Sequence, residues 1–153
     1  MQTAILELHS ILRWAILILL VASVIASFRR WAGNRQFEGG NRTIFILTLI
    51  STHLNFLVGL YLLLFGRYGV IGAQLPPGVN IMKERFYRFF LIEHPTGMLI
   101  AIVLVTLGSR FSKMNKSGKG QYKKAFWCFL IALLIVLLMI PWPFMSGIGR
   151  PLI

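Results

Sequence analysis

Long apolar runs alternate with short polar linkers along this chain of 153 residues. Four runs, at residues 4–28, 43–65, 87–109 and 125–142, are long enough to cross the roughly 30 Å hydrocarbon core of a membrane, which takes about 20 helical residues. The linkers are short, so consecutive helices should pack antiparallel. The pattern predicts an all-α integral membrane four-helix up-and-down bundle, a single transmembrane domain over residues 1–153. We expect residues 1–28 to be a retained anchor rather than a cleaved signal peptide, because basic residues follow this run instead of preceding it.

The composition supports a membrane protein and excludes several other classes. Hydrophobic residues make up 57% of the chain and charged residues only 13%, whereas about a quarter of a soluble domain is charged. The single cysteine excludes an internal disulfide, a cysteine zinc site and covalent c-type haem attachment. No phosphate loop, dinucleotide turn, zinc-protease motif or serine elbow occurs. We therefore expect an electron-transfer protein or subunit more than a stand-alone enzyme.

Basic residues outnumber acidic residues by 16 to 4, and they gather in the linkers. In a soluble protein such a charge would suggest nucleic acid, but here membrane topology and anionic lipid headgroups explain it better. Ten lie in the first and third linkers: Arg29, Arg30, Arg35, Arg42, Arg110, Lys113, Lys116, Lys119, Lys123 and Lys124. The second linker and the tail hold only five: Arg67, Lys83, Arg85, Arg88 and Arg150. The positive-inside rule predicts a multi-pass protein with both termini on the outer side.

A few polar residues interrupt the apolar runs, and all three histidines are among them. Ionisable groups at membrane depth usually face a bundle interior, a cavity or a partner, so each is a functional candidate. These residues are Glu7, His9, Arg13, His53, Asn55, Glu93 and His94. Helical spacing places several of them on stripes with small or polar neighbours. The stripes run through His9, Arg13, Ile16, Leu20, Ser23 and Ser27, through Thr48, Thr52, Asn55 and Gly59, and through His94, Gly97, Ala101 and Gly108.

Depth in the membrane selects among the histidines. At about 1.5 Å per residue from each span's midpoint, His94 lies about 8 Å and His9 roughly 10 to 14 Å toward the outside, whereas His53 lies within about 2 Å of the midplane. Two imidazoles that bind one iron from opposite faces must project to a similar level. His9 with His94 is therefore the better pair, and His53 with His94 stays possible.

Three functions fit these residues. The first is one b-type haem in the bundle interior, with His9 and His94 as axial ligands of the iron and His53 as a substitute or a quinone-side residue. Arg13 and Arg150 would then pair with the haem propionates, and Glu93 would orient a ligating histidine. The second is a metal or proton site of His and Glu residues, although their spread in depth counts against one three-histidine centre. The third is a cofactor-free structural or assembly subunit of a larger membrane complex, held by polar pairs between helices.

Several segments are similar to those of a small bacterial family of four-span membrane proteins named cytochrome B. The similarity covers nearly the whole chain and rests on LHSILRW (Leu8 to Trp14), STHLNFLVGLYL (Ser51 to Leu62), the Glu93-His94 pair with Met98, AIVLVTLGS (Ala101 to Ser109), PWPF (Pro141 to Phe144) and Gly149-Arg150. The family's motif positions are matched by His9, Arg13, His53, Glu93 and His94.

The resemblance implies a haem-bearing, cytochrome b-like protein of the bacterial inner membrane in a respiratory or quinol-linked setting. Its partners would include quinone and a respiratory subunit, with a homo- or hetero-oligomer as a further expectation. Two features depart from expectation: Pro95 follows the Glu93-His94 pair, and three histidines cannot supply the four axial ligands of two haems.

Overall fold

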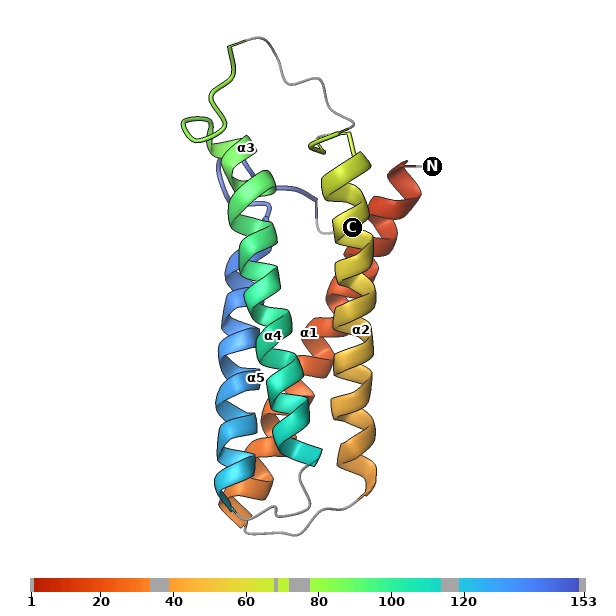
Figure 1. Cartoon of the computed structure of the whole chain (residues 1–153), viewed down its shortest axis with the longest axis vertical. Coiled ribbons are helices and arrows are strands. Elements are labelled where there is room, and N and C mark those ends of the chain that lie inside the picture. Colours follow the sequence, from red (N-terminus) through yellow and green to blue (C-terminus); the bar gives the residue numbers. More distant parts are fainter. Residues whose placement is uncertain (1, 34–38, 68, 72–77, 114–118, 152–153) are drawn as a thin grey trace.

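The computed structural model describes residues 2–33, 39–67, 69–71, 78–113 and 119–151, and within these ranges every regular element is helical. The elements in chain order are α1 (Gln2–Gly33), α2 (Gly39–Phe65), α3 (Arg85–Arg88), η1 (Phe89–Glu93), α4 (His94–Lys113) and α5 (Lys119–Met139). Four long helices, α1, α2, α4 and α5, lie side by side with alternating direction (Figure 1). The predicted all-α architecture of four helices is confirmed.

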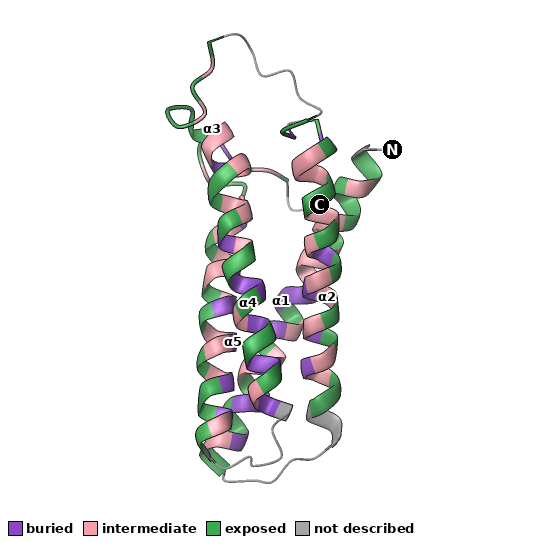
Figure 2. Ribbon diagram, viewed as in Figure 1, coloured by how far each residue is buried: buried purple, intermediate pink, exposed green. Residues whose placement is uncertain are grey.

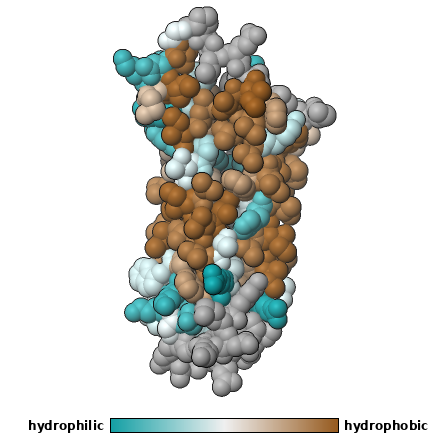
Figure 3. All heavy atoms as spheres, in the orientation of Figure 1, coloured by the Kyte–Doolittle hydropathy of each residue, from teal (hydrophilic) through white to brown (hydrophobic). Residues whose placement is uncertain are grey.

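Four segments of the described chain are long and apolar enough to cross a membrane: Thr3–Gly33, Arg42–Phe65, Arg85–Ser112 and Gly120–Met139. At most 33% of the most apolar window of each segment is buried inside the bundle. The outward surface is consequently apolar: Ile18 is 69% exposed and Leu138 68% exposed. Brown apolar side chains cover most of the middle of the face in Figure 3, while hydrophilic residues gather toward the two ends. Such a surface suits lipid and not water.

The fourth helix ends earlier than the predicted span. It stops at Met139, whereas the apolar run suggested residue 142. Pro141 and Pro143 explain the difference, because proline supplies no amide donor and disfavours a helical conformation in the residue before it. The Trp142 side chain ties the tail to the helix, because its Nε1 donates to the Leu137 carbonyl oxygen at 2.9 Å. The tail also closes on itself, because the Arg150 amide donates to the Pro141 carbonyl oxygen at 3.1 Å.

The four long helices form a ring in which each contacts two neighbours. Helix α1 packs against α2 and α5, and α4 packs against the same two helices. Helices α1 and α4 therefore occupy opposite corners of the bundle, and residues on their inner faces meet across its interior. Buried residues lie mainly where the helices face one another (Figure 2).

The apolar core runs along the interior from Ile140, just after the end of α5, to Ala26 and Phe45 near the basic linkers. The Phe45 and Phe129 rings stack at a centroid distance of 5.3 Å with 9° between their planes. A Cβ atom at Gly108 would lie 3.1 Å from the Phe129 ring, so glycine at this position lets α4 and α5 approach closely. At the same end Arg30 is only 3% exposed, and its guanidinium lies over the Tyr122 ring at 5.7 Å.

A layer of buried hydroxyl groups crosses the interior between α1, α2 and α4. Ser23 Oγ and Thr48 Oγ1 lie 2.8 Å apart, joining α1 to α2, and Ser109 Oγ donates to the Phe45 carbonyl oxygen at 3.3 Å, joining α4 to α2. The hydroxyls of Ser27 and Thr52 bond to carbonyl groups of their own helices. The stripe residues from Ile16 to Ser27 and from Thr48 to Asn55 that helical spacing placed together are buried.

The third span contains a π-helical turn directly before its proline. Residues Phe89–Glu93 form this turn, η1, between α3 and α4. Pro95 has no amide hydrogen, and its ring would crowd the carbonyl group of Leu91 in a regular α-helix. A wider turn relieves this crowding, so the helical path runs on from Arg85 to Lys113. The turn also brings the rings of Phe89 and His94, five positions apart, to a centroid distance of 5.9 Å.

Candidate functional site

Two of the three histidines meet across the bundle. The imidazole centroids of His9 on α1 and His94 at the start of α4 are 6.3 Å apart, and the ring planes are inclined at 67°. Both side chains are partly buried. Since α1 and α4 occupy opposite corners, the two rings approach each other through the interior. The structure thus brings together the pair that the depth argument favoured.

His94 is held by the last turn of α5. Its Nδ1 lies 2.8 Å from the main-chain carbonyl oxygen of Met139. A carbonyl oxygen only accepts, so Nδ1 carries the hydrogen and donates it. In the neutral ring this leaves Nε2 with a free lone pair, the arrangement found in metal-ligating histidines.

A close contact between α4 and α5 helps to bring Met139 near His94. A Cβ atom at Gly97, one turn after His94, would lie 2.6 Å from Cγ of Met139. Only glycine leaves room for this methionine against α4. The small residue therefore allows the end of α5 to come near enough for its carbonyl group to reach the His94 ring.

His9 lies against α2. A Cβ atom at Gly59 would lie 3.1 Å from Cε1 of His9, so the absence of a side chain there makes space for the ring. Asn55, one turn earlier, lies beside the same ring. Within the described chain, Nδ1 of His9 and Oδ1 of Asn55 are both buried side-chain atoms that lack a hydrogen-bond partner. A hydrogen bond between these two side chains would satisfy both atoms.

His53 stands apart from this pair. Its Nδ1 donates to the Leu49 carbonyl oxygen of its own helix at 2.8 Å. Among the residues that the structure describes, no three of His, Cys, Asp or Glu lie together in a group that could hold a metal ion. The three-histidine centre considered from the sequence is thus not formed in the described part of the chain.

Two other predicted site residues, Glu93 and Arg150, lie at the same end of the bundle as the histidine pair but outside its interior. Glu93 is exposed and forms an ion pair with Arg88, whose Nε lies 2.8 Å from Oε1. The acceptor for His94 is therefore the Met139 carbonyl group and not Glu93. Arg150 places its guanidinium over the rings of Phe90 at 5.1 Å and Phe86 at 5.5 Å.

The two remaining ionisable residues of the first span differ in exposure. Arg13, one turn beyond His9 along α1, is partly buried, and its guanidinium lies over the Trp14 ring at 5.5 Å. Glu7 is exposed on the outside of α1. Arg13 therefore belongs to the interior near the histidine pair, whereas Glu7 does not.

The four long apolar helices indicate a multi-pass helical membrane protein, with a histidine pair between its helices. Neutral imidazoles in this setting can bind a transition metal or can form a hydrogen bond between helices. Comparison of the chain with protein-family models, with curated proteins and with solved structures gives no match.

Proposed function

We propose that this protein binds one b-type haem in the membrane and transfers electrons, with His9 and His94 as the axial ligands of the haem iron. The observation that carries this proposal is the approach of the two imidazoles from opposite corners of the bundle, with their centroids 6.3 Å apart. Cofactor sites in helical bundles are built in this way, from side chains on facing helices.

The separation of the rings fits two ligands of one metal ion. Two imidazoles that bind one ion from opposite sides place their centroids about 6 Å apart, because each metal–nitrogen bond is about 2 Å long and the nitrogen lies about 1 Å from its ring centre. The bond from His94 Nδ1 to Met139 leaves Nε2 as the ligating atom. For His9 the unpartnered Nδ1 beside Asn55 offers the same arrangement.

When bound, haem would supply a one-electron iron centre whose potential depends on its axial ligands and on burial. The residues of this chain would hold it and exclude water. We assign Arg13 and Arg150 to its propionates, because both are cations near the histidine end of the bundle. His53 remains the substitute ligand or a residue on the quinone side. A quinol pool or a respiratory partner subunit would exchange the electrons.

We further propose that the protein lies in a bacterial inner membrane with both termini outside. The C-terminal ends of α1 and α4 and the N-terminal ends of α2 and α5 lie at one end of the bundle (Figure 1). Ten Lys and Arg residues belong to the two linkers at that end, which favours the cytoplasmic side. The histidine pair would then lie toward the outer surface.

The deciding experiment is the visible spectrum of the protein purified from membranes of a haem-producing host. We expect a reduced-minus-oxidised difference spectrum with a sharp α band of the b type and one haem per chain. His94→Asn should abolish the band, because the Asn amide can still donate to the Met139 carbonyl group but cannot bind iron. His9→Asn should abolish it as well, whereas His53→Asn, a matched change outside the pair, should leave it.

Three outcomes would overturn this proposal. A folded but colourless wild-type protein that copurifies with stoichiometric partner chains would support a structural subunit instead. Copper or zinc without iron in elemental analysis would support a metal site. An α band that persists in His94→Asn but is lost in His53→Asn would show that His53, and not His94, binds the iron.

A further inference from the structure

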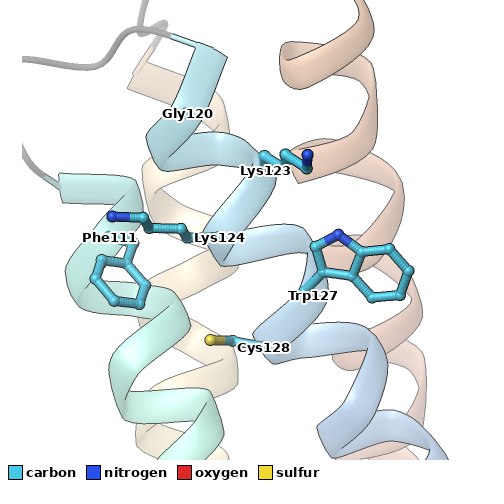
Figure 4. A pocket seen from close by; sticks show the side chains of 6 residues that line it. All are labelled: Phe111, Gly120, Lys123, Lys124, Trp127 and Cys128. Atoms are coloured by element: carbon cyan, nitrogen blue, oxygen red, sulfur yellow. The ribbon is translucent and has the colours of Figure 1, made fainter.

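The basic end of the bundle carries a shallow groove on its outer surface, far along α5 from the histidine pair. The groove has a volume of about 570 Å³. Its lining comes from the last turns of α4 and the first turns of α5, namely Phe111, Gly120, Lys123, Lys124, Trp127 and Cys128. Figure 4 shows Gly120 at the top of this surface, the two lysines on either flank of α5, and Trp127 and Cys128 below them. The proposed electron transfer uses none of these residues.

The groove combines an apolar floor with a cationic rim. Both lysines are exposed, and each ammonium group lies over an aromatic ring: Lys123 Nζ is 5.7 Å from the Trp31 ring centroid and Lys124 Nζ is 5.7 Å from that of Phe111. Trp127, which is 47% exposed, is an amphipathic ring of the kind that prefers the membrane interface. Among the residues that the structure describes, none places a side chain between the lysines at Gly120, where an added Cβ atom would meet no described atom within 4 Å.

We propose that this groove binds an anionic phospholipid. The headgroup phosphate would lie at Gly120 between Lys123 and Lys124, and an acyl chain would run down the surface past Trp127 and Cys128. Charge complementarity supports this occupant, because lysines near a membrane surface attract anionic lipid. The order of the lining residues along α5 supports it too. The cations lie near the end of the helix and the apolar lining continues toward the middle of the span, which matches the order of headgroup and acyl chain in a lipid.

The test uses Trp127 as a probe. In a variant with Trp14, Trp31 and Trp142 replaced by Phe, the remaining Trp127 reports which lipid touches it, because lipids with brominated chains quench its fluorescence on contact. We would reconstitute this variant into phosphatidylcholine vesicles that contain brominated phosphatidylglycerol, or brominated phosphatidylcholine for comparison. Phosphatidylglycerol should bind preferentially, by about fivefold for each lysine that contacts the headgroup. The preference should decrease as the salt concentration rises.

Two double variants separate a site from a general charge effect. Lys123→Gln with Lys124→Gln should remove the preference. Arg29→Gln with Arg42→Gln removes the same charge from exposed positions at the same end of the bundle, outside the groove, and should keep it. Equal quenching by the two lipids, or a preference that survives the loss of both lysines, would overturn the proposal.

A second measurement covers the case in which the single-tryptophan variant does not fold. Native mass spectrometry of the otherwise unchanged protein should show retained phosphatidylglycerol, which Lys123→Gln with Lys124→Gln eliminates and Arg29→Gln with Arg42→Gln does not. Retention of phosphatidylcholine to the same extent, or binding of an acidic protein at the lysines in place of lipid, would refute the assignment.

Discussion

The imidazole of His94 donates to the carbonyl oxygen of Met139, at 2.8 Å, and so joins the first residue of α4 to the last residue of α5. The last four carbonyl groups of any α-helix lack partners within the helix. His94 satisfies one of these groups in α5 from a neighbouring helix. This hydrogen bond satisfies the last carbonyl group of α5, as the Trp142 indole does for Leu137, and it orients the His94 ring.

The contact between Gly97 and Met139 should make α4 sensitive to a single methyl group. Gly97→Ala should destabilise the bundle by about 1–3 kcal/mol, because its Cβ atom would overlap Met139. Adding Met139→Ala should relieve the overlap, so that the double variant is more stable than the sum of the single changes by about 1–2 kcal/mol.

Thermal unfolding in detergent, followed by circular dichroism, measures this coupling. Gly120→Ala is the matched control. It makes the same replacement in a helix where the new methyl group meets none of the described residues, and helix propensity should make it neutral or stabilising. Additive effects of Gly97→Ala and Met139→Ala would show that the two residues do not collide.

Gly59 should control the position of His9. Gly59→Leu would place a side chain where the His9 ring now lies, with the first added carbon already 3.1 Å from Cε1. We expect the affinity for haem to fall about tenfold or more, as measured by titration of the apoprotein. The same Gly-to-Leu change at Gly120 should leave haem binding as it is. Full haem binding by Gly59→Leu would argue against His9 as a ligand.

Asn55 should orient His9 through a hydrogen bond between the two side chains. Asn55→Leu removes the acceptor and should weaken haem binding by about 10- to 100-fold, the usual cost of losing the partner of a ligating histidine. Thr52→Val is the control, because the Thr52 hydroxyl is buried one turn away but bonds to the Thr48 carbonyl group of its own helix. Equal effects of the two changes would indicate a structural role for Asn55.

The Ser23–Thr48 hydrogen bond should couple α1 to α2. A double-mutant cycle with Ser23→Ala and Thr48→Val should give a coupling energy of about 0.6 kcal/mol, typical of hydrogen bonds between membrane helices. Unfolding in mixed micelles at increasing denaturing detergent provides the free energies. Ser27→Ala should show little coupling to Thr48→Val, because the Ser27 hydroxyl bonds to carbonyl groups of α1 itself.

The orientation of the bundle can be read from cysteine labelling in intact cells. On a Cys128→Ser background, Phe144→Cys places a thiol in the exposed tail and Ala32→Cys places one in the exposed last turn of α1. A membrane-impermeant maleimide should label residue 144 and leave residue 32 unlabelled until the membrane is permeabilised. The reverse pattern would place both termini in the cytoplasm.

The helices and the histidine pair could be predicted from the sequence for different reasons. Hydrophobic runs give the spans directly, because a membrane of known thickness sets their length. Depth counting favoured His9 with His94 over His53, because each residue rises about 1.5 Å along a helix and the level of a residue in its span can be estimated from its position. The ring separation of 6.3 Å could not be predicted, since it depends on which helices occupy opposite corners.

Other parts of the site could not be predicted, or only in part, from the amino-acid sequence. The acceptor for His94 is a main-chain carbonyl group, which every residue carries, so nothing in the sequence singles out Met139. Glu93 was the natural candidate by its position beside His94, but Arg88 lies close enough to pair with it. The π-helical turn had a partial signal in Pro95, whose missing amide hydrogen indicated a disturbance at Leu91 without giving its form.

The diagonal placement of His9 and His94 has a consequence for how the protein survives in the cell. A ligand that bridges neighbouring helices adds little to contacts already present, whereas one that bridges opposite corners ties all four helices into one cooperative unit. Its binding free energy then adds to the stability of the folded state. Chains without the ligand would open more often and be removed first by quality-control proteases. Cofactor supply, and not transcription alone, would then set how much of this protein accumulates.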